Sequence, residues 1–110
     1  MIVRVGHIDY AVRTFTRDEL RDDNTAWGRH CVEDPTIKID AGITPREQAT
    51  ILIHEVIHAC YYAAGQDGDT LGEEAVATML GRMLAGVFLA NPHLSAALHQ
   101  GIHHGKAIVK

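Results

Sequence analysis

Hydrophobic and polar residues follow two different periods along this chain, and the change falls near Thr44. In residues 2–16 and 27–40, β-branched residues tend to alternate with polar ones, as in the TIKID run of residues 36–40. Alternation with a period of two is typical of strands with one buried face. We therefore expect one strand or two short ones over residues 2–16, and a hairpin over residues 27–40 that turns at residues 33–35.

Helical signals begin at Thr44. This threonine, the proline that follows it and Glu47 form the pattern of a capping box, with proline at the first helical position. Such a box marks a helix start because it provides partners for backbone N–H groups that the first turn leaves free. The helix is expected to run to about Ala64 and to stop at Gly65.

A second helix is expected from about Leu71 to Leu89, after a loop over residues 66–70, and the Asn-Pro pair at residues 91–92 should end it. Residues 93–99 predict a further short helix. The apolar residues of the second helix recur on one face: Val76, Leu80, Met83, Leu84 and Val87.

Strands followed by helices, without a repeat or a linker, indicate a single α+β domain over residues 1–110. We expect a short, mostly antiparallel sheet packed on the first helix, with the second helix beside it. The chain has 110 residues, of which 46% are hydrophobic, so it can bury a small core.

Composition excludes several classes of partner. A formal net charge of −4 without a basic run argues against nucleic-acid binding. The chain shows neither the apolar segment of a signal peptide nor an apolar run near the roughly 20 residues of a membrane span. We therefore expect a cytoplasmic protein without membrane contact. The two cysteines, Cys31 and Cys60, form no CxxC motif and predict no disulfide framework. The sequence does not determine the oligomeric state.

The first predicted helix carries the motif HExxH in His54, Glu55 and His58. Imidazoles four residues apart share a helix face and can bind one zinc ion. Zinc lowers the pKa of a coordinated water toward neutrality, and Glu55, about 100° round the helix from His54, is positioned to take the proton. Although the chain contains eight histidines, roughly 0.03 matches to this motif are expected by chance. We predict a zinc site with both histidines as ligands and Glu55 as the catalytic base.

A catalytic zinc ion takes three protein ligands and keeps one open position. Glu73 and Glu74, near the start of the second predicted helix, are both candidates for the third ligand. Of the two, helical periodicity places Glu73 nearer the centre of the apolar face. A later histidine is a further alternative, from the group His93, His99, His103 and His104.

These residues resemble the gluzincin class of metallopeptidases, in which a glutamate on the next helix is the third zinc ligand. In several of those families, small residues follow the ligand glutamate at plus three and plus seven, and a bulky residue at plus six. Glu74 fits this arrangement through Ala77, Leu80 and Gly81, and Glu73 does not. The resemblance therefore implies His54, His58 and Glu74 as zinc ligands. It departs at Thr78, where those families carry an acidic or amide residue that supports a ligand histidine.

The strand-rich first half and the two helices are also similar to minimal zincin-like proteins of phages and prophages, over about residues 28–92. The resemblance implies a zinc metallopeptidase that cleaves peptide or protein substrates, in the host cytoplasm if it is phage-encoded. We further expect residues 36–40 to form an edge strand that holds an extended peptide by strand addition. The alternative is a non-catalytic binding module that keeps zinc on the same scaffold, and the intact Glu55 favours the enzyme.

Overall fold

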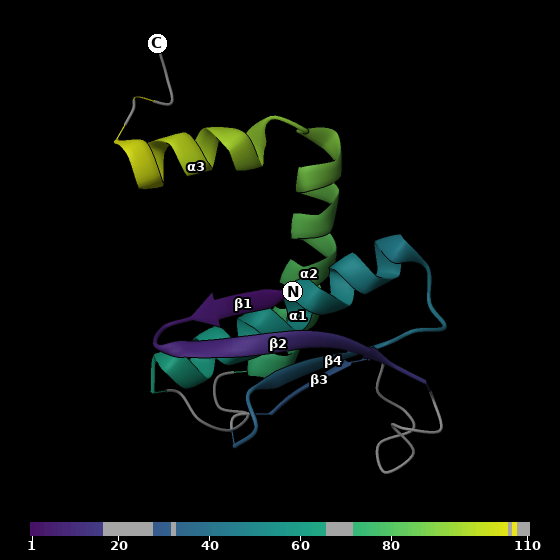
Figure 1. Ribbon diagram of the computed structural model, residues 1–110. Helices are drawn as coiled ribbons and strands as arrows, with labels where there is room; N and C mark the ends of the chain where they lie inside the picture. The colour runs from purple at the N-terminus through teal and green to yellow at the C-terminus, as the bar shows by residue number, and fades with distance from the viewer. Residues whose placement is uncertain (17–27, 32, 66–71, 106, 108–110) are drawn as a thin grey trace.

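The computed structural model describes residues 1–16, 28–31, 33–65, 72–105 and 107 (Figure 1). Strands precede helices, which confirms the α+β class. The loop predicted over residues 66–70 lies outside the described residues. Within the described ranges the elements are β1 (Ile2–Val5), β2 (Ile8–Phe15), β3 (Gly28–Cys31), β4 (Thr36–Asp40), α1 (Pro45–Ala63), α2 (Glu73–Ala90) and α3 (Leu94–His104).

The strands form one sheet in the order β1-β2-β4-β3. β1 and β2 are an antiparallel hairpin with a tight turn at Gly6, whose φ of 62° favours glycine. β3 and β4 form the second predicted hairpin, which is also antiparallel. The central pair is parallel, with Ala11 of β2 opposite Thr36 of β4. The sheet is therefore mixed, so the prediction of mostly antiparallel pairing is correct for the two outer pairs and wrong for the central one.

β4 is an internal strand, which corrects the prediction that residues 36–40 form an edge. It pairs with β2 on one side and with β3 on the other, so its backbone has no free side for an added peptide. Every residue of β4 except Lys38 is buried. A short alternating run looks alike in edge and internal strands, because the pattern reports the buried face rather than the number of paired neighbours.

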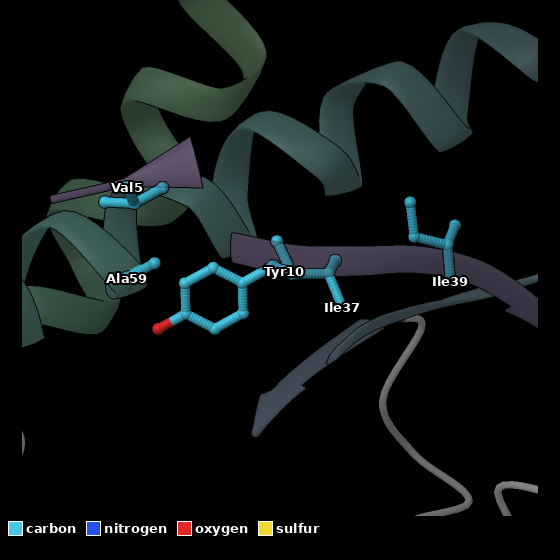
Figure 2. Packing of buried hydrophobic residues seen from close by; sticks show 5 residues of the cluster. All are labelled: Val5, Tyr10, Ile37, Ile39 and Ala59. Carbon is cyan, nitrogen blue, oxygen red and sulfur yellow. The ribbon is translucent and has the colours of Figure 1, made fainter. Parts of the chain in front are cut away.

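The core lies between the sheet and α1, and Figure 2 shows its buried cluster of Val5, Tyr10, Ile37, Ile39 and Ala59. Tyr10 and Ile37 are fully buried, and burial of a large apolar side chain contributes about 1.5–3 kcal/mol. The predicted packing of the HExxH helix on the sheet is thereby confirmed. Further residues of α1 pack against this cluster while remaining partly exposed: Ile51, Leu52 and Val56.

The first half of α2 packs on α1 through small residues. Ala77 and Gly81 are both buried. A Cβ atom at Gly81 would lie 3.1 Å from the carbonyl oxygen of Thr50 and 3.4 Å from the Cβ of His54. The absence of a side chain at Gly81 therefore lets α2 approach α1 closely, directly beside the HExxH motif.

The second half of α2 and the whole of α3 extend away from the sheet and α1 (Figure 1). The apolar face predicted for α2 is therefore covered only in part: Val76 and Leu80 are half-buried, whereas Met83 is 62% exposed. α3 is longer than the segment predicted over residues 93–99. In the described part of the chain, no helix taken alone has the length and apolarity to cross a membrane; α2 and α3 pass that test only together, across a bend of 97°.

Substitution of Gly81 by leucine should destabilise the protein by about 1–3 kcal/mol, because the new side chain overlaps the α1 backbone. Gly86→Leu on the same helix is the matched control, since a Cβ there meets nothing within 4 Å. Leucine also has a higher helix propensity than glycine, so this control should keep or raise stability. Urea denaturation followed by circular dichroism measures both free energies of unfolding. Equal stability of the two variants would show that the α1–α2 spacing does not depend on Gly81.

Candidate metal centre

α1 presents the two histidines of the HExxH motif on one helical face. The helix begins with the predicted capping box, in which the Thr44 hydroxyl accepts a hydrogen bond from the Glu47 N–H at 3.2 Å. The Glu47 carboxylate accepts one in return from the Thr44 N–H at 3.3 Å. Ten residues further along, His54 and His58 lie one turn apart, mostly buried, with their Nε2 atoms 3.1 Å from each other.

Glu74, in the first turn of α2, brings a carboxylate to both histidines. Its Oε1 lies 3.1 Å from His54 Nε2, and its Oε2 lies 2.8 Å from His58 Nε2. Thr78, one turn further on, donates its hydroxyl hydrogen to Glu74 Oε1 at 3.4 Å. The Glu74 side chain is 61% exposed, so this side of the cluster is open to solvent. The structure thus brings together the three residues that the sequence predicts as ligands.

The chemistry and spacing of the His-His-Glu group fit a metal ion. Two imidazole nitrogens and a carboxylate oxygen bind an ion such as zinc at about 2.0–2.2 Å each, and tetrahedral angles then place the ligand atoms roughly 3.3 Å apart. Here the two Nε2 atoms are 3.1 Å apart, and each lies 2.8 or 3.1 Å from a different oxygen of Glu74. With one ligand atom taken from each of the three residues, these atoms all lie within 4.8 Å of one another. This group can therefore hold a metal ion.

Glu73 contacts His58 on the ring nitrogen that faces away from His54 and Glu74. It is buried, and its Oε2 accepts a hydrogen bond from His58 Nδ1 at 2.5 Å. This contact leaves Nε2 as the His58 nitrogen that faces His54 and Glu74. A carboxylate behind a ligand histidine orients the ring and raises its basicity. Sequence reasoning considered Glu73 only as a rival ligand and missed this contact, although the periodicity that places Glu73 on the buried face was the available signal.

The charge around His58 favours its protonated form. Burial alone would lower the pKa of His58, but the hydrogen bond to Glu73 and the negative charges of Glu55, Glu74 and Glu73 outweigh it. The net result is a pKa of His58 above its ordinary value of 6.5. The surrounding carboxylates therefore favour a positive charge at His58, here a proton.

Glu55, the predicted catalytic base, is a buried residue of α1. Its negative charge is one of the contributions that raise the pKa of His58, so it lies within electrostatic reach of the cluster. The motif thus folds on the helix that its chemistry requires. The role of Glu55 as a base stays a prediction.

A cleft of about 400 Å³ adjoins His54. This volume lies within the range of small-molecule binding sites. Its walls come from the exposed sides of α1 and α2, and Arg82 contributes a positive charge. The lining residues are Glu47, Thr50, Ile51, His54, Thr78 and Arg82.

The later histidines, weighed as an alternative third ligand, do not join the cluster. The group of metal-ligating atoms found among the described residues contains only His54, His58 and Glu74. α3 lies away from α1 (Figure 1). Its own histidines approach one another instead: the ring centroid of His99 lies 4.4 Å from that of His103 and 5.4 Å from that of His104.

Comparison of the chain with models of protein families, with curated proteins and with solved structures finds no match in any of the three. The resemblance to gluzincins therefore depends on the residues of the motif and on the geometry of the cluster. What these support directly is a small α+β protein with a His-His-Glu group that can bind a metal ion.

Replacement of either glutamate should weaken zinc binding, but to different extents. If Glu74 is a ligand, Glu74→Ala should abolish tight binding, whereas Glu73→Ala removes only the partner of His58 and should cost about 10–100-fold in affinity at unchanged stoichiometry. Competition titration with a chromogenic chelator measures both, with Asp9→Ala, an exposed acid of β2, as control. Full affinity in Glu74→Ala would exclude it as a ligand, and an equal loss in both variants would contradict their division of roles.

The metal-free protein should become less stable as the pH rises through the folded-state pKa of His58. Because folding raises this pKa, the stabilisation is fully present below about 6.5 and is lost above the folded-state value. Denaturation of chelated protein at a series of pH values measures the effect, and His58→Gln should remove that part of the pH dependence. A free energy of unfolding that rises over the same pH interval would contradict this prediction. Metal affinity should instead increase as the pH rises, because protons compete with the metal for the same nitrogen.

Proposed function

We propose that this chain is a zinc-dependent hydrolase of the gluzincin type that cleaves peptide or other amide bonds. The observation that carries the proposal is the convergence of His54, His58 and Glu74 from two helices, with Glu55 beside them in an HExxH motif. In this proposal the zinc ligands are His54, His58 and Glu74. When bound, zinc supplies a Lewis acid that polarises the substrate carbonyl and activates a water.

The chain's own residues have distinct parts in this proposal. Glu55 takes the proton of the attacking water and later delivers it to the leaving amine. Glu73 holds His58 in the tautomer whose Nε2 lone pair faces the cluster. Thr78 restrains one oxygen of Glu74 by a hydrogen bond. This threonine stands where the related families carry an acidic or amide residue, and Glu73 gives His58 the carboxylate partner that the Thr78 position lacks.

Substrate has two routes of access that support the proposal. The exposed side of Glu74 leaves the cluster open to solvent. The cleft beside His54 has room for one or two side chains, and its lining carries one charge of each sign, from Glu47 and Arg82. We infer from these features that short peptides or exposed protein segments are the substrates.

A binding module that holds zinc without turnover is the second candidate. The observation that favours it is the exposed apolar surface of α2 and α3, which is typical of a site for another protein. The two candidates differ at Glu55, because a purely structural metal site has no need of that carboxylate.

Glu55→Gln should reduce peptide cleavage by about 10²–10⁴-fold while leaving zinc bound, because it removes the proton acceptor and preserves shape. The assay is cleavage of a quenched fluorescent peptide library by zinc-loaded protein, beside zinc stoichiometry by elemental analysis. Glu33→Gln, at an exposed glutamate before β4, is the matched control and should remain active. If the zinc-loaded wild type cleaves nothing, the binding module replaces the enzyme; if Glu55→Gln cleaves as well as wild type, Glu55 is not the base.

A further inference from the structure

Large apolar side chains are exposed along one part of the molecule. We call residues 83–104, the second half of α2 together with α3, the helical arm. Elsewhere in the described chain, the exposed large apolar residues are Met1, Ile2, Tyr62 and Met79, the last of which lies one turn before the arm. The arm carries Met83, Leu84, Val87, Phe88, Leu89, Leu98 and Ile102, all of which are exposed.

The rest of the described chain does not cover this surface. α3 packs against neither α1 nor the sheet, and it projects from the end of α2 in Figure 1. At Gly86, in the α2 part of the arm, an added Cβ would meet no atom within 4 Å. On α2, Leu84 and Phe88 follow the buried Gly81 at plus three and plus seven, so they continue the face that packs on α1 nearer the N-terminus.

The arm is also without formal charge. Every residue from 83 to 104 is described, and none of them is Asp, Glu, Lys or Arg. Its polar residues include four histidines, of which His99, His103 and His104 gather on α3. A neutral apolar surface offers no charge complementarity to a strongly acidic or basic partner.

We propose that the helical arm is the interface of a homodimer, covered in solution by the arm of a second copy of this chain. A surface without charges can face a second copy of itself without like-charge repulsion, and a two-fold interface brings the same patch of both copies together. The combined exposed area of its seven large apolar side chains is on the order of 700 Å², close to the roughly 800 Å² that a standard interface buries on each partner.

A lipid bilayer is a poorer fit to the same surface. The free part of α2, from Met83 to Ala90, is about 12 Å long, against a hydrocarbon core of about 30 Å. The first half of α2 is held on α1 and carries the cluster glutamates. Helices that lie on membranes usually have Lys and Arg along their polar face, and the arm has none.

Sedimentation velocity and light scattering on the full chain, with and without zinc, test the proposal. Wild type should show twice the monomer mass of 12.1 kDa. Leu89→Glu and Ile102→Glu, at side chains 63% and 76% exposed, each bring a charge into the proposed interface. Each should raise the dimer dissociation constant at least roughly 30-fold. Ile2→Glu is the matched control, because Ile2 is 62% exposed on β1 outside the arm and its variant should stay dimeric.

Two outcomes would overturn the dimer. The first is wild type that stays monomeric at high micromolar concentration, including a monomer that sediments with phosphatidylcholine–phosphatidylglycerol vesicles. The second is a dimer whose dissociation constant is unchanged in both Leu89→Glu and Ile102→Glu, or is raised as much by Ile2→Glu as by these two variants. Zinc stoichiometry measured on the same samples separates this result from the proposed function, since the metal cluster lies at the other end of α2.

Discussion

The contact between α1 and the first half of α2 is the constraint on which the metal centre depends. His54 and His58 lie on one helix and Glu73 and Glu74 on the other, so helix packing rather than chain connection sets the distances between them. At Gly81 the backbone of α2 comes so close to α1 that even a Cβ would lie 3.1 Å from the Thr50 carbonyl oxygen. On its other side, α1 is held to the sheet through the buried Ala59. Small residues at both contacts keep the helix between its two neighbours.

Charge is the second constraint on this site. Three carboxylates, Glu55, Glu73 and Glu74, act on His58, and their combined effect raises its pKa in spite of its burial. A buried carboxylate such as Glu73 is unfavourable without a cationic or hydrogen-bonding partner, and His58 provides one. A proton on His58 offsets this negative charge only in part. A divalent ion offsets more of it and also receives the Nε2 lone pairs of both histidines, so metal binding and cluster stability are coupled.

Local signals were enough to predict most of the elements. The capping box at Thr44 correctly predicted the start of α1, because it depends on three neighbouring residues. Pairing between distant strands left no such signal, so the parallel contact of β2 with β4 and the internal place of β4 were not predicted. That pairing needs a long connection, and the chain between Phe15 and Thr36, which includes β3, provides it.

The choice between Glu73 and Glu74 shows where sequence reasoning about the site ended. Periodicity pointed to Glu73 and resemblance to Glu74, and both residues contact the histidines from adjacent positions about 100° apart on α2. The cluster lies at the edge of the buried face of α2, so one glutamate reaches it from the interior and the other from solvent. Periodicity can identify a buried face, but it cannot assign two neighbours to opposite sides of one imidazole. That assignment depends on the rotation of α2 about its axis, which the packing at Gly81 determines.

The two halves of α2 have different surroundings. Its first half carries the cluster glutamates and packs on α1, and its second half continues the same apolar face beyond the body of the molecule. A chain of this length buries only a small core, so an uncovered apolar face is a large fraction of its apolar surface. The cluster glutamates and the uncovered apolar residues therefore lie on the two different halves of one helix.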